Sequence, residues 1–588
     1  MIEDALAQHH LHEVSEMKQV TQPASASPFK LTSTVLFNNW TVSVVLSAIY
    51  VITIIIFIKP VYPENDNIAI LEASRDGYLV EFVGVAFTVY LHLLHKYVSM
   101  HVPWYALTLY AAHIASISLF LITLSAIPGS RPIKILYAIV YLACYSYFVF
   151  CVDYNSSSIM VGANALLAFL ILGKANRSRL QAILLGTVFS ASFLLRTHGM
   201  LGVLVFTAPF IVLYWIKDFI KGRLLLVFLV PVLLCAGVDL LFKGPLASPG
   251  YKQYRPYVYL QGELHNYGNL RYADSAILAI NQWTLNDLKL FSNWMYVDEH
   301  KYSREKLENL SNHINRKKEM NTPRSALDPK HIQYFMKIYA PLLMLIGGIL
   351  FLAFYGLNRK NSLLASAFIL YGVFGAGYLE LYYQFPVRIG FPLLLMYSTF
   401  LFSSVLLLFD PRGAVAKNLL KKMSLTLFVC CILSAGYLQA KFASELYTME
   451  TQFGAIYERI YTTLNSKYKG SVVLLGPTGF DFTGIAVSSL DDLFDKFQTV
   501  GFGWPIFSEL FYAQLNEIGL KHGHELFPAF VDRSNYYILA NAKEKQCIVD
   551  YLRENDYPTV KAVPVEWFDG LSVFSKDSFS VLYKFVSK

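Results

Sequence analysis

The sequence is dominated by apolar segments of about 20 residues that recur along most of its length. Eleven such segments lie near 40–59, 104–127, 135–152, 158–173, 180–195, 201–216, 224–242, 337–357, 363–383, 391–409 and 423–440. A helix of about 20 apolar residues is long enough to cross the hydrocarbon core of a bilayer. Mean hydropathy is +0.42, and only 15% of the 588 residues are charged, against about 25% in soluble domains. These features exclude a soluble enzyme, a disordered chain and a secreted disulfide scaffold, and they predict a polytopic membrane protein.

One further apolar stretch, residues 79–98, differs from these segments in the placement of its polar side chains. Its polar residues, spaced 7, 4, 3 and 4 positions apart, are Glu81, Thr88, His92, His95 and Ser99. That spacing gathers them along one stripe of a helix, and such an amphipathic helix is typical of the membrane interface. We therefore expect the stretch not to cross the bilayer. A spanning helix whose polar stripe faces the bundle is the alternative.

Lys and Arg are distributed unevenly between alternate short loops. With eleven spans and a cytoplasmic N-terminus, fourteen of them fall in the cytoplasmic loops 128–134, 174–179, 217–223, 358–362 and 410–422. The opposite short loops, 153–157, 196–200 and 384–390, hold only Arg196 and Arg388. Because cytoplasmic loops are enriched in Lys and Arg, this bias predicts a cytoplasmic N-terminus. A twelve-span chain of opposite N-terminal orientation satisfies the same bias.

This orientation divides the chain into three expected parts. These are a cytoplasmic tail (1–39), a transmembrane module (40–440) with outer loops 60–103 and 243–336, and an outer C-terminal domain (441–588). The last part has strand-like runs at Ser471–Gly476, Tyr536–Ala540 and Phe579–Phe585 and a helical pattern at Ala542–Glu554, which predict a small α/β domain. The expected fold class is thus an all-α polytopic bundle with a small C-terminal α/β domain.

Acidic residues follow the first span directly. Glu64 and Asp66 stand in Pro63-Glu-Asn-Asp-Asn67, where the chain leaves the membrane. A carboxylate at this boundary can act as a general base or hold a divalent metal ion; a solvated loop is the plain alternative. A second acid, Asp153, opens the next outer loop before Tyr-Asn-Ser-Ser-Ser. It is a candidate acceptor or metal ligand, and equally a helix cap.

Two arginines stand at otherwise apolar span ends on the same side. Arg196, with His198 two positions later, and Arg388 can bind a phosphate group or extend toward lipid headgroups. The long loop 243–336 carries candidate substrate contacts at Tyr254, Arg255, Trp294 and Asp298. Aromatic residues of this kind also anchor proteins at the interface. The net charge of +8 gives no indication of a nucleic-acid partner.

The arrangement resembles the GT-C class of membrane glycosyltransferases, in an uncharacterised bacterial branch. The stretches that carry the resemblance are Pro63-Glu-Asn-Asp-Asn-Ile68, Val102-Pro-Trp-Tyr105, Asn293-Trp-Met-Tyr-Val-Asp298 and Ser303-Arg-Glu-Lys-Leu307. The resemblance implies Asp66 as catalytic base, Asp153 as second acid, and Arg196 and Arg388 as ligands of a donor phosphate. Asp66 is followed by Asn67 and not by a second acid or an aromatic residue. The resemblance therefore assigns no metal, and a divalent ion stays open as a cofactor.

The resemblance implies an inverting transfer of a sugar from a polyprenyl-phosphate donor to a cell-envelope acceptor: lipopolysaccharide, another glycan, a lipid or a protein. The expected location is the outer face of a bacterial inner membrane, with the C-terminal domain in the periplasm. Two alternatives remain. One is an O-antigen-type ligase or polymerase that uses a polyprenyl-diphosphate glycan, and the other is a non-enzymatic flippase for lipid or polysaccharide.

Overall fold

The expected polytopic helical bundle is present in the computed structural model. The structure describes residues 33–62, 65–175, 178–216, 222–319, 329–357, 359–382, 386–408, 419–475, 485–486, 500, 502–568 and 580–587. The chain divides into two units, 1–42 and 43–588. The first contributes only the beginning of the first membrane helix to the described residues, and the second holds every contact discussed below.

Ten described helices are long and apolar enough to cross a membrane. They are α2 (Ser33–Ile58), α5 (Trp104–Ala126), α6 (Arg131–Phe150), α7 (Tyr154–Ala175), α9 (Thr197–Ile216), α10 (Gly222–Phe242), α15 (Pro329–Gly356), α16 (Arg359–Tyr382), α17 (Val387–Leu407) and α19 (Leu419–Lys467). A shorter apolar helix, α8 (Arg179–Leu195), completes the set of eleven. These elements match the eleven segments expected from the sequence.

Two short helices follow α2 without adding a crossing. They are α3 (Asn65–Asp76) and α4 (Val85–Tyr97). The 13 residues of α4 span about 20 Å, less than the hydrocarbon thickness of about 30 Å. The Tyr105 hydroxyl, at the start of α5, donates to Asn67 Oδ1 at 2.7 Å. Because the start of α5 lies beside the start of α3, the chain between them returns to the side from which it started.

The two faces of α4 differ in the way an interfacial helix requires. Thr88 and His95, two members of the polar stripe, are buried against the protein. Tyr90 and Tyr97 are exposed on the opposite side together with Val89 and Leu93. The outward face is therefore mostly apolar and also carries the exposed Lys96, whose long side chain can reach the headgroups when the helix rests on lipid.

The bundle has a central pair of helices and a lipid-facing periphery. In α7 and in α17, 94% of the residues of the apolar window are buried, whereas the share in α10 is 11%. The sequence of α7 is rich in Ser, Ala and Gly, which allow close packing of helices in a membrane. Gly162 of α7, for example, lies against Ser192 of α8, whose Oγ would be 2.5 Å from an added Cβ.

Outside the bundle, the long loop forms its own helices. They are α11 (Pro249–His265), the 3-10 helix η1 (Asn266–Tyr272), α12 (Ser275–Asn281), α13 (Leu285–Ser292) and α14 (Arg304–Glu319). Capping residues define several ends. Asp274 accepts from two backbone N–H groups at the start of α12, and Thr284 forms a capping box with Asp287 at the start of α13.

The C-terminal part contains a four-stranded sheet of order β2-β4-β6-β5. Its strands are β2 (Val472–Leu475), β4 (Tyr536–Ala540), β5 (Lys561–Phe568) and β6 (Ser580–Val586). Strands β2 and β4 are parallel, and the other pairs are antiparallel. The helices of this part are α21 (Glu509–Glu517), η3 (Gly523–Glu525), α22 (Leu526–Asp532) and α23 (Ala542–Glu554). The three expected strands and the expected helix are therefore present, and β5 is an additional strand.

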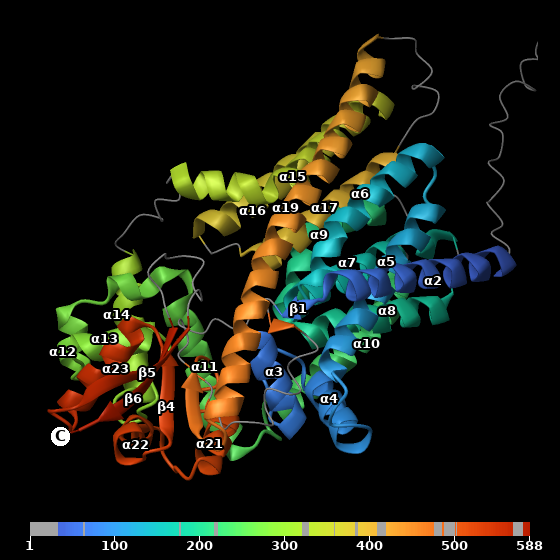
Figure 1. The fold of residues 1–588 in the computed structure, drawn as a ribbon. Coiled ribbons are helices and arrows are strands. Elements are labelled where there is room, and N and C mark those ends of the chain that lie inside the picture. The colour runs from blue at the N-terminus through green and yellow to red at the C-terminus, as the bar shows by residue number, and fades with distance from the viewer. Residues whose placement is uncertain are drawn as a thin grey trace, which may run out of the picture. The chain divides into compact units, whose positions relative to one another are not determined.

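The long loop and the C-terminal part share one hydrophobic core. Phe291 and Leu310 from the loop are buried in the same cluster as Phe511, Ile538 and Phe585. In addition, α19 continues unbroken for 49 residues through the expected domain boundary at 440–441, and its far end leads into β2 (Figure 1). The division into 40–440 and 441–588 stays a prediction. The shared core joins the long loop 243–336, which was assigned to the transmembrane module, to the C-terminal part.

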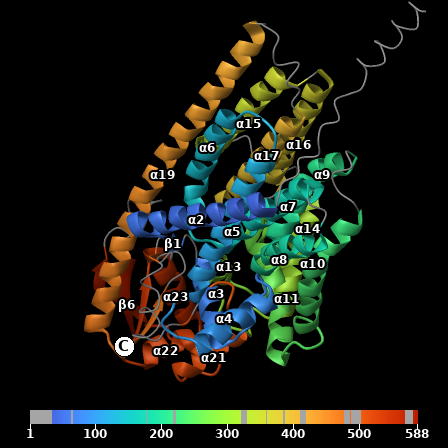
Figure 2. The same cartoon turned by 90° about the vertical axis from the view of Figure 1, so that its right-hand side faces the viewer.

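A two-stranded sheet ties the C-terminal part to the end of the first span. Strand β1 (Val61–Tyr62) pairs antiparallel with β3 (Ile485–Ala486). Figures 1 and 2 show α3, α4, α11 and α21 gathered on the side of the bundle to which β1 leads. The short helices after the first span, the long loop and the C-terminal part therefore meet on one face.

Labelling of a single cysteine tests this topology. His101 is exposed between α4 and α5, so a His101→Cys variant made without the six natural cysteines should react from the Asp66 side with an impermeant maleimide. A cysteine at Ser130, between α5 and α6, should react only from the opposite side. Labelling of both positions from the same side would contradict the eleven-span arrangement.

A close helix contact provides a stability test. A Cβ at Gly186 in α8 would lie 2.1 Å from the carbonyl oxygen of Phe228 in α10, so Gly186→Ala must push the two helices apart. We expect a loss of about 1–3 kcal/mol, measured as a lower melting temperature in detergent. The matched control is Gly237→Ala in α10, where an added Cβ meets nothing within 4 Å. Equal melting of the two variants would contradict the close contact.

Candidate active site

Asp66 lies at the centre of a cluster of charged and aromatic side chains. It stands in the first turn of α3, and its side chain is 27% exposed. The guanidinium of Arg388 is 3.7 Å from Asp66 Oδ2, and the Tyr154 hydroxyl donates to the same oxygen at 3.3 Å. Three elements far apart in sequence, α3, α7 and α17, thus meet at one carboxylate.

The backbone before Asp66 is held in place by two neighbours. Val61 and Tyr62 pair with β3 on one side. On the other side, the Val152 N–H donates to the Val61 carbonyl at 2.9 Å, and Val61 forms a parallel bridge with Cys151. This pairing places the start of α3 next to the loop that carries Asp153. The first turn of α3 also presents the positive end of the helix dipole to the carboxylate.

The two arginines predicted from the sequence both reach this cluster. Arg388 is the second residue of α17, which begins directly after Pro386. Arg196 is extended between α8 and α9. Its guanidinium lies 5.1 Å from the centroid of the Phe82 ring and 5.4 Å from that of Tyr154. Both positive groups therefore stand at helix ends close to Asp66, and their binding of a phosphate stays a prediction.

Trp504 brings the C-terminal part into the site, which the sequence did not predict. Its side chain acts on Asp66 by lowering the pKa of that carboxyl group, and its ring meets the Phe82 ring edge to face, with centroids 4.9 Å apart. The Tyr254 hydroxyl donates to the Trp504 carbonyl at 2.7 Å. The preceding residue, Gly503, has φ +90°, a conformation that favours glycine. The Gly-Trp pair in this turn is the signal that could have identified the position.

The carboxyl groups of Asp66 and Asp153 influence each other. Burial raises the pKa of Asp66, while the positive charge of Arg196 and hydrogen bonds from Tyr154 and Trp504 act in the opposite direction. The pKa of Asp153 is raised to about 6, because burial and the negative charge of Asp66 outweigh the hydrogen bonds from the backbone of Ser156 and the side chain of Asn155. The two groups therefore titrate as a pair. Each becomes a stronger base than an exposed aspartate.

Asp153 caps the central helix α7. Its Oδ2 accepts from the backbone N–H groups of Asn155 at 3.0 Å and Ser156 at 3.1 Å, and its side chain is buried. Of the two roles that the sequence left open, the structure shows the cap. The Coulombic contact with Asp66 makes Asp153 a neighbour of the site as well.

Three further sequence candidates are Glu64, His198 and Arg255. Glu64 falls outside the described residues. His198 is exposed at the start of α9, with Arg196 and Glu81 as its charged neighbours. Arg255 is 3.6 Å from Glu81 and donates to the Lys243 carbonyl at 3.0 Å, so it anchors the chain between α3 and α4.

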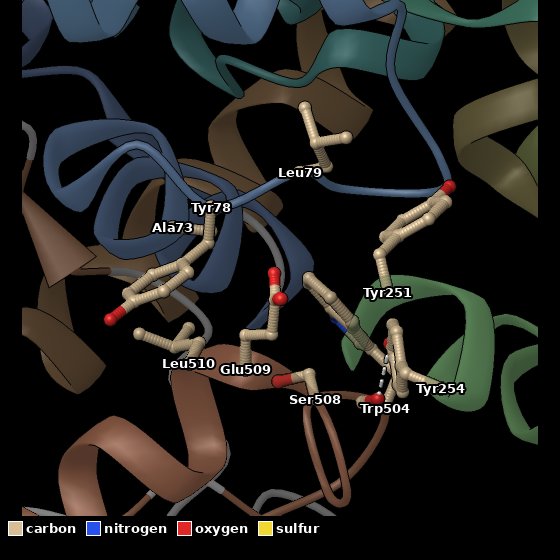
Figure 3. A pocket seen from close by; sticks show the side chains of 9 residues that line it. All are labelled: Ala73, Tyr78, Leu79, Tyr251, Tyr254, Trp504, Ser508, Glu509 and Leu510. Atoms are coloured by element: carbon tan, nitrogen blue, oxygen red, sulfur yellow. Dashed lines mark hydrogen bonds between the residues drawn. The ribbon is translucent and has the colours of Figure 1, made fainter. Parts of the chain in front are cut away.

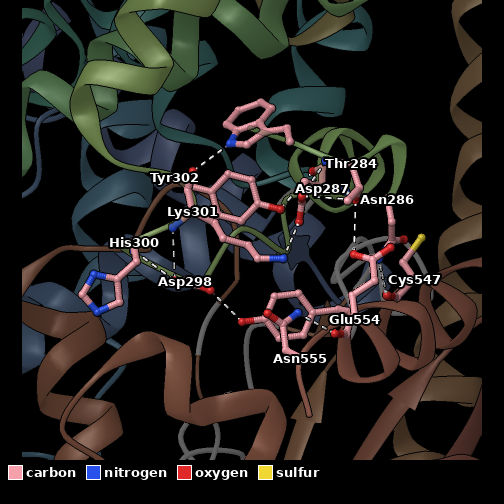
Figure 4. Close-up of polar contacts among 12 residues, drawn as sticks. Thr284, Asn286, Asp287, Asp298, His300, Lys301, Tyr302, Cys547, Glu554 and Asn555 are labelled. Carbon is pink, nitrogen blue, oxygen red and sulfur yellow. Dashed lines mark hydrogen bonds and ion pairs between the residues drawn. The ribbon is translucent and has the colours of Figure 1, made fainter. Parts of the chain in front are cut away.

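Trp294 and Asp298 both contact other parts of the protein in the described residues. The Trp294 ring stacks on His265 with centroids 3.7 Å apart. Asp298 is buried and accepts from the Tyr551 hydroxyl at 2.7 Å and from the backbone of the following turn (Figure 4). The expectation that these two residues contact substrate stays a prediction that no contact here supports.

A small pocket lies behind Trp504. It is lined by Ala73, Tyr78, Leu79, Tyr251, Tyr254, Trp504, Ser508, Glu509 and Leu510 (Figure 3). Glu509, the acid of this pocket, accepts from the Ser248 hydroxyl at 2.6 Å. It is therefore engaged in holding α21 to the long loop. In the part of the chain that the structure describes, no group of three metal-ligating side chains includes Asp66 or Asp153.

Comparisons with known proteins give a likeness of fold. No family model matches the sequence, and no curated protein matches it. Two solved structures of ArnT from Cupriavidus metallidurans are similar over nearly the full length. The structure bound to undecaprenyl phosphate has a TM-score of 0.38 and 11% identity, covering 94% of this chain and 98% of that chain. The apo structure has a TM-score of 0.37 and 12% identity, covering 93% and 98%.

Substitutions at Asp153 test its capping role. Asp153→Ala leaves the N–H groups of Asn155 and Ser156 without their buried acceptor, so we expect a loss of about 1–3 kcal/mol. Asp153→Asn retains a carbonyl oxygen and should lose clearly less. The measurement is the melting temperature of both purified variants. Melting of both variants at the wild-type temperature would contradict a structural role for this side chain.

Proposed function

We propose that the protein is a membrane glycosyltransferase of the GT-C type that moves a sugar from a polyprenyl-phosphate donor to a cell-envelope acceptor. The observation that carries the proposal is the meeting of Asp66 with Arg388 and Arg196 where the helices leave the bundle. The sequence resemblance had assigned these residues to the base and to the donor phosphate. They come from three separate regions of the chain.

The two arginines match the charge of a lipid phosphate. A polyprenyl chain occupies the bilayer, so its phosphate lies at the membrane boundary. Arg196 ends the apolar helix α8 and Arg388 lies at the start of the apolar helix α17. Arginine binds phosphate oxygens in a bidentate manner. Positive charge at this position also stabilises the phosphate as it leaves the sugar, which is the main requirement for such a leaving group.

Asp66 supplies the base. Its carboxylate takes the proton of an acceptor hydroxyl, the hydroxyl oxygen forms a bond to the anomeric carbon, and the bond from that carbon to the lipid phosphate breaks. The raised pKa of Asp66 makes this carboxylate a better proton acceptor near neutral pH. One displacement inverts the anomeric configuration. In the donor complex, Arg388 turns from Asp66 to the phosphate and releases the base.

The location that we propose for this reaction is the outer face of a bacterial inner membrane. Asp66 lies on the side opposite the loops that hold fourteen Lys and Arg residues, and such loops are cytoplasmic in most membrane proteins. On this assignment the C-terminal part lies in the periplasm. It contributes Trp504 to the site.

Transfer assays with paired variants test the roles of the two charges. Asp66→Asn should lower the rate constant of sugar transfer by about 10²–10⁴-fold while donor binding is retained. Arg388→Gln should weaken donor binding about 10-fold or more, because a charge-assisted hydrogen bond is lost, and Arg388→Lys should lie between Arg388→Gln and wild type. The measurements are labelled-sugar transfer from undecaprenyl-phosphate sugar to an envelope extract, and donor binding to purified protein in liposomes.

Asp76→Asn is the matched control, because Asp76 ends the same helix and is exposed. It should retain wild-type transfer. Full transfer by Asp66→Asn would refute the assignment of the base. Transfer only from a polyprenyl-diphosphate glycan would select a ligase or polymerase instead. Lipid movement without any sugar transfer would select a flippase.

A further inference from the structure

A second cluster of reactive side chains lies between the long loop and the C-terminal part. Glu299 and His300 stand in the turn between α13 and α14, and His524 lies in η3. One ligand atom from each lies within 4.8 Å of the others. Glu299 Oε1 is 3.1 Å from His524 Nδ1, and Glu299 Oε2 accepts the backbone N–H of His524 at 3.0 Å. Segments 225 positions apart are thereby joined by one carboxylate.

The turn that carries these residues is rigid on its inner side. Asp298 Oδ1 accepts from the backbone N–H groups of His300 at 2.9 Å and Lys301 at 3.2 Å. Lys301 itself pairs with the buried Asp287 at 3.0 Å. Figure 4 shows the His300 ring directed away from this network. The inner contacts therefore fix the backbone at position 300 and leave the imidazole outside the network.

The segment that carries His524 packs closely against the turn that carries His300. An added Cβ at Gly523 would lie 1.9 Å from the Val297 carbonyl oxygen, so only glycine permits this approach of the two backbones. The ring of His524 lies 4.9 Å from the ring of His300, measured between centroids. The two histidines are thus placed by backbone packing, which keeps the reorganisation needed to bind a ligand small.

The charges around Glu299 favour a cation. Its Oε1 lies 3.3 Å from His522 Nδ1 and 3.1 Å from His524 Nδ1, and among the described residues it forms no ion pair with Lys or Arg. Two imidazoles and one carboxylate form a donor set that binds zinc, and imidazole is a preferred ligand of zinc, copper and nickel. The carboxylate of Glu299 therefore has only histidines as partners and no permanently charged group to balance it.

We propose that Glu299, His300 and His524 bind a zinc ion, with water in the fourth position. Tetrahedral zinc places its ligand atoms about 3.3 Å apart, so the three side chains must close by about 1.5 Å at most, which rotation of the exposed His300 ring provides. The ion links the turn at 298–303 to η3. It stabilises the joint between the long loop and the C-terminal part and shares no residue with the Asp66 cluster.

Zinc titration of the full-length protein tests the proposal. The sequence also contains His9, His10 and His12, so the background protein carries Gln at these three positions and a purification tag without histidine. We expect one zinc ion per chain in competition with a chromogenic chelator, and a higher melting temperature when zinc is added. His300→Gln with His524→Gln should weaken zinc binding at least about 100-fold and abolish the shift in melting temperature.

His101→Gln, an exposed histidine outside the cluster, should bind zinc like the background protein. The single variant His300→Gln, at an exposed position, covers the case in which the double variant fails to fold. A variant counts as folded when its melting temperature in the presence of chelator equals that of the background protein. Unchanged zinc affinity in either cluster variant, or no zinc binding by the background protein, would overturn the proposal.

Discussion

The absence of water in a bilayer core is the constraint on which this structure depends. A backbone N–H or carbonyl without a partner in hydrocarbon costs several kcal/mol, so each crossing must be a complete helix. Chemistry that needs a charge is thereby confined to helix ends. Arg196 and Arg388 stand at such ends, and Asp66 lies in the first turn of a helix outside the bundle. The composition of the site follows from that confinement.

The sequence predicted the spans well because their signal is local. A run of about 20 apolar residues is recognised without tertiary information. The uneven distribution of Lys and Arg between alternate loops then favoured a helix at 79–98 that does not cross the bilayer. The strand β5 was missed because Pro564 and charged residues interrupt it. Proline is tolerated there because β5 is an edge strand, and its register is irregular between Pro564 and Glu566.

The candidate site was predicted in part. Asp66, Arg196 and Arg388 were found because charged residues at span ends are rare and conspicuous. Trp504 was missed because its contact with Phe82 joins segments more than 400 positions apart in sequence. The hydrogen bond between Asp298 and Tyr551 was not predicted either, because the two residues lie 253 positions apart in sequence.

The unbroken helix α19 has a mechanical consequence. About 22 of its 49 residues lie beyond the membrane window, which ends at Glu445, and they form a rod about 33 Å long. A change of 10° in the tilt of the membrane part displaces the far end of this rod by about 6 Å. Membrane helices adjust their tilt to bilayer thickness. The sheet that follows α19 is therefore placed where small changes in the tilt of the membrane part have their largest effect.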